Sequence, residues 1–520
     1  MPGPLNVRAV ALYILLLCAA LGVIGGCTAL PSLEARTTST TIFETGDTQL
    51  GKAISPLVNG HPGLSGIYPL PDARDAFAAR ALLARAAERT LDVRYYIWRN
   101  DTSGTLLLEA LRAAADRGAR VRLLLDDNNT SGLDPLLAAL NSRPNIEVRL
   151  FNPFVIRAPR WIGYATDFFR LNRRMHNKSF TADNQATIIG GRNVGDEYFG
   201  ATEGVLFADL DVLAVGPVVT EVSNDFDRYW ASGSAYPVDR LLPAATPSQS
   251  TELVAAASRV EHDPAALAYM NAIRNLTFVD ELAQRTLHLD WAATRMISDD
   301  PGKGLGLAPP EALLFQKLRE IIGESAVQVD LVSPYFVPTA AGVAAFVALA
   351  KRGVKIRVLT NSLEATDVAI VHAGYAKWRK TLLEGGISLY ELRRLSPEIA
   401  AGKRAGRMGS SGSSLHAKTF SVDRSRVFIG SFNFDPRSSK LNTEMGFVID
   451  SPALARNIEA ALDRRVPESA YEVRLSEAGQ LYWSERRGGQ VLRHDTEPGT
   501  TFWQRAGVWI MSKLPVEWLL

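Results

Sequence analysis

The sequence predicts an α/β protein made of two duplicated domains, each with a mixed sheet flanked by helices, facing each other about a pseudo-twofold axis. Two observations lead to this prediction. Strand-like and helix-like segments alternate along the chain, which is the pattern of α/β layers. One constellation of polar residues occurs twice, around His176 and His416, 240 residues apart. A repeat of that length indicates duplicated domains, because solenoid repeats are about 20–50 residues long.

The composition is that of a large folded protein. The chain has 520 residues, 47% of them hydrophobic, which suffices for two or three domains and excludes general disorder. Its 57 Lys and Arg against 55 Asp and Glu argue against nucleic-acid binding. The two cysteines, Cys18 and Cys27, allow neither a disulfide framework nor a structural zinc site. With seven histidines in few clusters, we expect no metal and no cofactor.

Residues 1–26 have the pattern of an export signal. Arg8 precedes an apolar run over residues 9–24, and the sequence Ile-Gly-Gly-Cys at residues 24–27 resembles a bacterial lipobox. That resemblance implies cleavage before Cys27 and lipid attachment to it; the alternative is an uncleaved N-terminal anchor. Both interpretations tether the protein to a membrane of the cell envelope, facing the periplasm, and leave open which membrane. We expect residues 27–70 to form a linker.

The first domain is expected to span residues 71–245. Residues 91–98, 119–125 and 146–151 are strand-like runs, rich in apolar and β-branched side chains. Residues 105–116 have helical spacing, and Gly118 follows as a helix stop.

The second domain is expected to span residues 311–475 and to repeat this order. Residues 351–357 (KRGVKIR) match residues 116–122 (DRGARVR) at the corresponding helix end. The elements predicted are strands at 327–336, 354–360 and 387–392, and helices at 342–351 and 365–383.

Two segments lie outside these domains. A connector over residues 246–310 is expected to be helical near 264–275 and 289–301, and we can assign no physical role to its Asp299-Asp300-Pro301 sequence. The tail, residues 476–520, ends in a stretch with three tryptophans among scattered Arg and Lys. That pattern is typical of a membrane-interface helix; the alternative is a helix that docks on the body.

Each half carries the same motif: His-x-Lys, four residues, Asp, six residues, and Gly-Gly/Ser-x-Asn. In extended backbone, alternate side chains share a face, so each histidine and its lysine point the same way. The strand that follows can lie alongside and bring the asparagine to that face. The members are His176, Lys178, Asp183 and Asn193, then His416, Lys418, Asp423 and Asn433.

Two such motifs facing each other make a pocket with two imidazoles and two lysines, which suits a phosphodiester. Cations and N–H donors hold the non-bridging oxygens, and no metal is needed. One imidazole can attack phosphorus while the other protonates the leaving alcohol. The resulting phosphohistidine then reacts with a second acceptor, and the motifs do not say whether that acceptor is an alcohol or water.

The paired motifs resemble the HKD motif of the phospholipase D superfamily. The resemblance covers the chain from about residue 70 onward and implies two phospholipase D-like α/β sandwich domains with a shared active site. Within the superfamily, the chain resembles bacterial cardiolipin synthases, particularly the C-type. The stretches that carry this are LDVRYYIW, RLLLDDNN, RLNRRMHNKSF, GGRNVGDEYF, VHAGYAKWRK, GSFNFDPRS and LPVEWLL.

The resemblance implies roles for the two imidazoles and for the acidic residues that orient them. His176 is the expected nucleophile and His416 the acid and base, with the reverse left open. In the second half, the orienting carboxylate matches Glu444. In the first half, alignment places Asp209 opposite Glu444, with Asp211 as the fallback.

The remaining motif residues are expected to support the phosphate. Asn193, Ser431 and Asn433 bind or orient it. Gly191 stands where the motif usually has serine, so the site is expected to be asymmetric, with the Gly191 N–H as the remaining donor. The catalytic motif also includes Asp183 and Asp423, for which orienting nearby backbone or basic groups is the favoured role.

The resemblance implies a phosphatidyltransferase that makes cardiolipin by passing a phosphatidyl group to phosphatidylglycerol. The donor is phosphatidylethanolamine, as the C-type resemblance suggests, or a second phosphatidylglycerol. The expected partners are these lipids and a membrane; no nucleic acid is expected, and no protein partner follows from the sequence. Two other functions stay open: a hydrolase with the same intermediate, either a phospholipase D or a nuclease, and a lipid-binding lipoprotein without activity.

Overall fold

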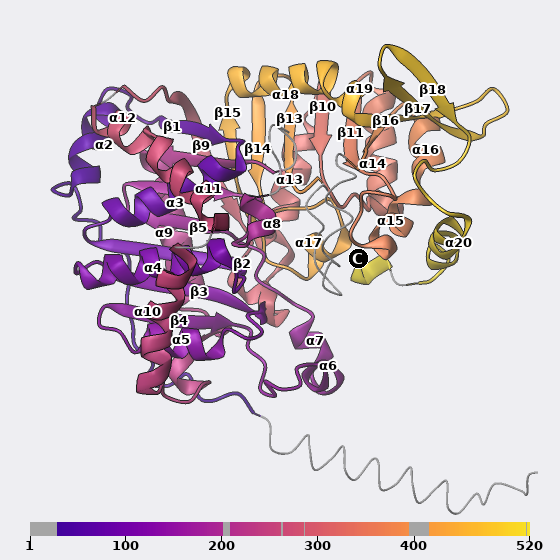
Figure 1. The fold of residues 1–520 in the computed structure, drawn as a ribbon. Coiled ribbons are helices and arrows are strands. Elements are labelled where there is room, and N and C mark those ends of the chain that lie inside the picture. Colours follow the sequence, from indigo (N-terminus) through magenta and orange to yellow (C-terminus); the bar gives the residue numbers. More distant parts are fainter. Residues whose placement is uncertain (1–28, 201–208, 262–263, 285, 395–414, 516) are drawn as a thin grey trace, which may run out of the picture.

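The computed structural model describes residues 29–200, 209–261, 264–284, 286–394, 415–515 and 517–520 (Figure 1). The expected export signal and the expected lipidation site at Cys27 lie outside these ranges. Within them, no helix has the length and apolar character needed to cross a membrane.

The first half of the chain forms a mixed sheet in which β2, β3 and β4 are parallel to one another and the other pairs are antiparallel. The predicted strands over residues 91–98, 119–125 and 146–151 are β2, β3 and β4. The order across the sheet is β8 (Ala235–Pro237), β4 (Ile146–Phe151), β3 (Arg120–Asn129), β2 (Thr90–Ile97), β5 (Ser179–Ala182), β6 (Ala186–Gly190), β7 (Asp211–Val215), β1 (Ser65–Leu70) and β9 (Asp290–Ser298).

The second half repeats the plan, with β10, β11 and β12 as its parallel strands. The predicted strand over residues 327–336 is shorter than expected, because the chain leaves the sheet after Val332. The order is β18 (Gln490–His494), β17 (Leu481–Arg487), β16 (Ala470–Leu475), β12 (Ser388–Leu392), β11 (Lys355–Asn361), β10 (Gln328–Val332), β13 (Thr419–Val422), β14 (Arg426–Gly430), β15 (Met445–Asp450) and β9.

Helices cover the outer faces of both sheets (Figure 1). In the first half, α3 (Ala73–Ala86) and α4 (Thr102–Asp116) begin at Asp72 and Asp101, whose carboxylates accept backbone N–H groups of the first turn. In the second half, α13 (Leu314–Gly323) and α14 (Thr339–Lys351) take the corresponding places before and after β10 and pack in that half's own core. The two-domain α/β class and the flanking helices are as predicted.

The connector and the tail are built into the two halves. Helices α10 (Pro247–Glu261) and α11 (Pro264–Asn275) pack against the first half's α4 and α3, and α12 (Phe278–Gln284) also lies on that side. At the other end of the chain, β17 and β18 extend the second sheet beyond β16.

Two predicted helices are wrong in form. Residues 289–301 are mainly strand β9, because the first part of this segment pairs with β1 and the rest with β15, so tertiary pairing overrides local preference. The single helix over 365–383 is two helices, α15 (Ala369–Ala376) and α16 (Arg379–Glu384). On either side of the break, Tyr375 and Arg379 both bind the carboxylate of Glu391, which is buried in β12.

One hydrophobic cluster joins the two sheets face to face. Ile189 of β6 and Val212 of β7 belong to the same buried cluster as Ile429 of β14 and Phe447 of β15. Each half also has a core of its own under its helices. The shared cluster therefore fixes the strands next to the two motifs against each other.

Candidate active site

His176 lies in an extended segment just before β5, where the two halves meet. The His176 N–H donates to the Thr443 carbonyl at 2.9 Å, and the Thr443 N–H donates to the Arg174 carbonyl at 2.9 Å. The segment is extended, as predicted for His-x-Lys, but its backbone partner at His176 is the opposite half. The position of this imidazole is therefore set by contacts across the interface.

Each imidazole is held at Nδ1 by a carboxylate from the opposite half. His176 Nδ1 lies 2.8 Å from Glu444 Oε2, and His416 Nδ1 lies 2.6 Å from Asp209 Oδ2. An Nδ1–H that donates to a carboxylate leaves Nε2 of the same ring for chemistry. The two carboxylates are those that the sequence predicted, and the structure crosses them between the halves.

In the first half, the structure brings Asp209 to an imidazole, whereas the fallback Asp211 pairs with Arg80 at 2.7 Å. The expectation that the Gly191 N–H serves the phosphate is wrong, because this N–H donates to the Leu210 carbonyl at 3.3 Å. Glycine at this position makes room for the carboxylate. A Cβ at Gly191 would lie 2.1 Å from Asp209 Oδ1, closer than any side chain could sit.

In the second half, a serine and a longer acid take the corresponding places. Ser431 Oγ donates to Glu444 Oε2 at 2.5 Å, and the Met445 N–H donates to Ser431 Oγ at 3.0 Å. The hydroxyl is thus committed to the carboxylate, so Ser431 orients Glu444. The asymmetry expected at Gly191 involves two positions that differ together. One half has glycine beside an aspartate, and the other has serine beside a glutamate.

The two imidazole–carboxylate pairs differ in charge state. Burial, together with the nearby lysines, holds the pKa of His176 well below its usual 6.5, and burial raises the pKa of Glu444 to about 7. Burial alone would raise the pKa of Asp209. The pKa nevertheless falls well below its usual range, because His416 and the neighbouring cations stabilise the charged carboxylate. Burial and Lys418 also lower the pKa of His416, but the firmly ionised Asp209 opposes that lowering, so His176 has the more strongly lowered pKa of the two rings.

Both motif lysines are buried beside the imidazoles. Each ammonium donates to the backbone carbonyl of the histidine two residues before it, which keeps Lys178 and Lys418 next to His176 and His416. Burial lowers the pKa of Lys178 to about 7 and that of Lys418 to about 8. An anionic phosphodiester between them would raise both values by favouring the charged forms.

The two motif asparagines have buried amide atoms without a partner. Asn193 Oδ1 accepts the Ile97 N–H at 3.2 Å, but Asn193 Nδ2 has no hydrogen-bond partner, and neither has Asn433 Oδ1. The assignment of O and N in an asparagine side chain is interchangeable, so rotating the Asn433 amide places a donor at the second position. Leaving such a group unpaired costs about 1–3 kcal/mol, which a phosphate oxygen would recover.

Asp183 and Asp423 lie at the opposite ends of β5 and β13 from the imidazoles. Asp183 accepts the backbone N–H groups of residues 88–90, just before and at the start of β2. Asp423 accepts those of residues 326–328 before β10. The structure does not bring either aspartate to the imidazoles, and their contacts match the backbone-orienting role that the sequence favoured.

Two tyrosines that sequence reasoning did not select line the imidazoles. The Tyr96 ring meets His176 edge-on at 4.9 Å, and the Tyr198 ring meets His416 at 5.2 Å. Tyr96 also lies 5.5 Å from the Lys178 ammonium. These rings exclude water from one side of each imidazole; their only signal in the sequence was their presence in the quoted family stretches.

The Asp299-Asp300-Pro301 sequence, which had no assigned role, supports Glu444. Asp299 Oδ2 accepts the Glu444 N–H at 2.9 Å, and the Asp299 N–H donates to the Glu444 carbonyl at 3.0 Å. Lys303 Nζ lies 2.9 Å from the Asp299 carboxylate and also donates to the Ser438 carbonyl at 2.8 Å. All these groups are buried, so the segment fixes the backbone of the residue that orients His176.

The site offers imidazole, ammonium and amide groups for a phosphate, and no cation-binding cluster. Among the described residues, no group of three or more His, Cys, Asp or Glu side chains is arranged to hold a metal ion.

Comparison with known proteins agrees with this geometry. The family model described as "Cardiolipin synthase, PLD-like domain" matches residues 80–230 and 318–466, one segment in each half. The chain belongs to the phospholipase D-like cardiolipin synthase family. Cardiolipin synthase C of Escherichia coli is 52% identical over 472 residues, covering 91% of this chain and all of that protein. An uncharacterised Helicobacter pylori protein is 30% identical, covering 92% and 94% of the two chains.

The fold also matches a solved structure. Phosphatidylserine synthase of Haemophilus influenzae superimposes with a TM-score of 0.58 at 13% identity, covering 91% of this chain and all of that one. The predicted family, the two-domain fold and the enzyme class are thereby confirmed.

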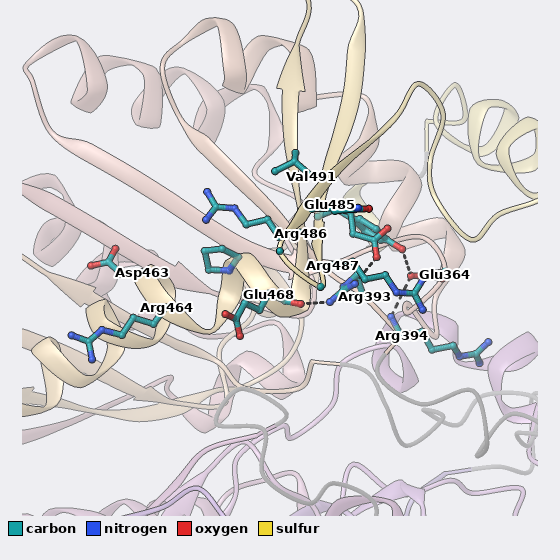
Figure 2. Close-up of a pocket in the computed structure, with 15 residues that line it drawn as sticks. Glu364, Arg393, Arg394, Asp463, Arg464, Glu468, Glu485, Arg486, Arg487 and Val491 are labelled. Carbon is teal, nitrogen blue, oxygen red and sulfur yellow. Dashed lines mark hydrogen bonds and ion pairs between the residues drawn. The ribbon is translucent and has the colours of Figure 1, made fainter.

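A surface cavity of about 920 Å³ lies away from this family's motifs, between the ends of β12, β17 and β18 (Figure 2). None of the motif residues lines it. Some of its polar side chains are already paired with one another. Arg393 pairs with Glu485 at 2.6 Å, and the Tyr471 hydroxyl donates to Glu364 at 2.9 Å. The chemistry therefore belongs to the imidazole site rather than to this cavity.

Proposed function

We propose that the protein is a phosphatidyltransferase that makes cardiolipin from phosphatidylglycerol and a second glycerophospholipid. The observation that carries the proposal is the pair of imidazoles, each held at Nδ1 by a carboxylate from the other half and beside a buried lysine. This arrangement supports two successive displacements at one phosphorus. The 52% identity to a protein named cardiolipin synthase C supports the choice of lipid substrates.

The first displacement loads the enzyme. His176 Nε2 attacks phosphorus, forming a P–N bond as the P–O bond to the donor's head group breaks, and His416 gives its Nε2 proton to the departing alkoxide. In the second displacement, neutral His416 takes the proton from a phosphatidylglycerol hydroxyl. That oxygen attacks phosphorus, and the P–N bond to His176 breaks.

The difference between the carboxylates supports this assignment of roles. A nucleophile must be neutral, and the environment of His176 keeps its pKa well below the usual value. A general acid must hold a proton before it gives it away. His416 has the ionised Asp209 at 2.6 Å to stabilise its imidazolium form.

The donor lipid is phosphatidylethanolamine or phosphatidylglycerol, which differ in the alcohol that leaves. The second candidate function is hydrolysis through the same intermediate, with water as the acceptor. The rings of Tyr96 and Tyr198 against the imidazoles favour the drier transfer reaction.

We also propose that residues 1–26 act as an export signal and that the protein is tethered to a membrane facing the periplasm. The support is the apolar run over residues 9–24 and the Cys27 that ends the lipobox-like sequence. Mass spectrometry of the mature N-terminus distinguishes a lipidated Cys27 from an uncleaved anchor.

The test is a lipid assay with the purified full chain in mixed phosphatidylglycerol and phosphatidylethanolamine vesicles, without added metal. Cardiolipin with free ethanolamine supports the phosphatidylethanolamine donor, and cardiolipin with glycerol alone supports phosphatidylglycerol. Phosphatidic acid without cardiolipin would establish the hydrolase instead. The His176→Ala variant should lose all product and form no phosphoenzyme, whereas His416→Ala should slow both displacements, because the first then lacks its acid and the second its base.

A further inference from the structure

Helix α20 (Phe502–Met511) presents its apolar side to solvent. Phe502, Trp503, Trp509 and Ile510 lie along one stripe of the helix, and all are exposed, Trp503 by 79%. The opposite side is attached to the body, with Val508 buried in a small cluster with Leu363 and Ala373. The helix therefore docks on the body, as the second alternative for the tail expected, and its aromatic stripe is uncovered.

The attachment of α20 is firm. The residue Glu497, just before the helix, is paired with Arg379 and lies 3.1 Å from His372 Nε2, and all three side chains are buried. The helix begins with a capping box between Thr501 and Gln504. The exposed stripe is thus held in place by the fold.

A second aromatic segment lies on the other half, in the helices α6 (Trp161–Thr166) and α7 (Phe168–Leu171) (Figure 1). Trp161 is 69% exposed and Phe169 is 79% exposed. The approach to α6 is anchored through Arg157, which pairs with Asp127 at 2.8 Å. Here too, an ordered base holds large aromatic side chains away from the core.

Arg437 ties the two aromatic segments together beside the motifs. Its guanidinium donates to Asn172 Oδ1 at 2.7 Å and to the Leu519 carbonyl at 3.1 Å. Asn172 directly follows α7 and precedes His176 by four residues, whereas Leu519 lies in the last turn of the chain, next to the exposed Trp518. Arg437 follows the motif residue Asn433 by four residues. The end of α7 and the chain end beyond α20 therefore meet where the two motifs come together.

We infer that α6–α7 and α20, with the chain end, form one aromatic rim around the entrance to the active site, and that this rim docks on the surface of a phospholipid bilayer. The inference rests on the proposed function, in which both substrates are lipids. Tryptophan and phenylalanine without covering protein are the side chains that a membrane interface accepts.

Charge favours a bilayer over another protein surface as the occupant. From residue 502 to residue 514, the chain has Arg505 and Lys513 and no acidic residue, which suits anionic phosphatidylglycerol head groups. In the other segment, Asp167 is neutralised by Arg170 at 2.6 Å. In the chain end, Glu517 is likewise paired, with Lys377 at 2.9 Å, so Arg505 and Lys513 are the basic side chains that these acid pairs leave beside the aromatic rings.

The test is photocrosslinking to phosphatidylglycerol that carries a diazirine on its acyl chain. The full chain is reconstituted in vesicles of phosphatidylglycerol and phosphatidylethanolamine, and the labelled peptides are identified by mass spectrometry. We expect label in residues 161–171 and 502–514 and none in α11, where Leu267 is exposed by 54% and serves as the apolar control. His176→Ala should be labelled like the parent while making no cardiolipin, which separates docking from turnover; label without cardiolipin in the parent chain would refute the proposed function and leave the rim intact.

Kinetics supply the second readout. The double variants Trp161→Ser/Phe169→Ser and Trp503→Ser/Trp509→Ser should lower cardiolipin formation in vesicles about tenfold. They should leave transfer between short-chain lipids dispersed as monomers unchanged, and Leu267→Ser should change neither. Equal loss on dispersed and vesicle lipids, or crosslinks at these segments between two copies of the chain without lipid label, would overturn the inference.

Discussion

Replacing Glu444 with glutamine tests the crossed arrangement of carboxylates. The amide has the shape of the carboxylate and can still accept the proton of His176 Nδ1, now 2.8 Å from Glu444 Oε2, but it carries no charge. Hydrogen bonds to charged groups contribute about 1.5–3 kcal/mol. We therefore expect Glu444→Gln to lower the rate of phosphoenzyme formation by about 10- to 150-fold.

The same substitution should stabilise the fold, because burial raises the pKa of Glu444 from its usual 4.5 to about 7. A carboxyl whose pKa is higher in the folded state than in the unfolded state binds its proton more tightly when folded. The fold is therefore penalised as pH rises from 4.5 to 7, by up to about 3 kcal/mol. Glu444→Gln should be more stable than the parent at pH 8 and equal to it near pH 4.

The assay is rapid-quench measurement of the phosphoenzyme across pH 5–9, with thermal unfolding on the same samples. In the parent, the rate should rise as Glu444 ionises near pH 7; in Glu444→Gln, this limb should be absent. Asp209→Asn is the matched control, since Asp209 is ionised throughout this range and its loss should leave the limb in place. The same pH limb in all three proteins would refute the assignment of Glu444 to His176.

Three further outcomes are expected. Gly191→Ala should abolish activity by displacing Asp209, whereas Gly323→Ala, whose added methyl group meets no atom within 4 Å, should be neutral in the vesicle assay. Lys303→Met should destabilise the protein by about 3–5 kcal/mol in denaturant unfolding, because it leaves Asp299 buried without its cation; Asp299→Asn with it should recover much of that loss. Above about pH 7, kcat/KM should fall as Lys178, with a pKa of about 7, and then Lys418, with a pKa of about 8, lose their protons, while kcat should hold to higher pH because bound phosphate keeps them charged.

The fold could be predicted wherever the local pattern and the tertiary pairing agree. The buried parallel strands β2, β3 and β4 are short runs rich in apolar and β-branched side chains, and they form as predicted. Strand β9 could not be predicted, because its extended form depends on pairing with β1 and β15, which are far from it along the chain. The break between α15 and α16 likewise depends on a buried carboxylate in β12.

The candidate site divides in the same way. Spacing alone located the histidines and lysines, since their geometry follows from alternation in extended backbone. Spacing gave no sign that the carboxylates cross between halves, because that depends on how the two sheets face each other through Ile189 and Ile429. It also gave no role to Asp299, whose partner Glu444 is 145 residues away.

A duplicated enzyme that catalyses two displacements needs its two imidazoles in different protonation states at the same moment. Identical halves would give both rings the same pKa, and neither would be preferred as the nucleophile. In this chain, the difference comes from one small exchange at the motif. Glycine at 191 admits the shorter Asp209 to the cations of the site, which keeps it ionised, whereas burial raises the pKa of the longer Glu444 to about 7 despite the hydrogen bond that it accepts from Ser431. Because each carboxylate serves the opposite half's histidine, neither half on its own contains a complete imidazole–carboxylate pair, and separation of roles depends on the interface itself.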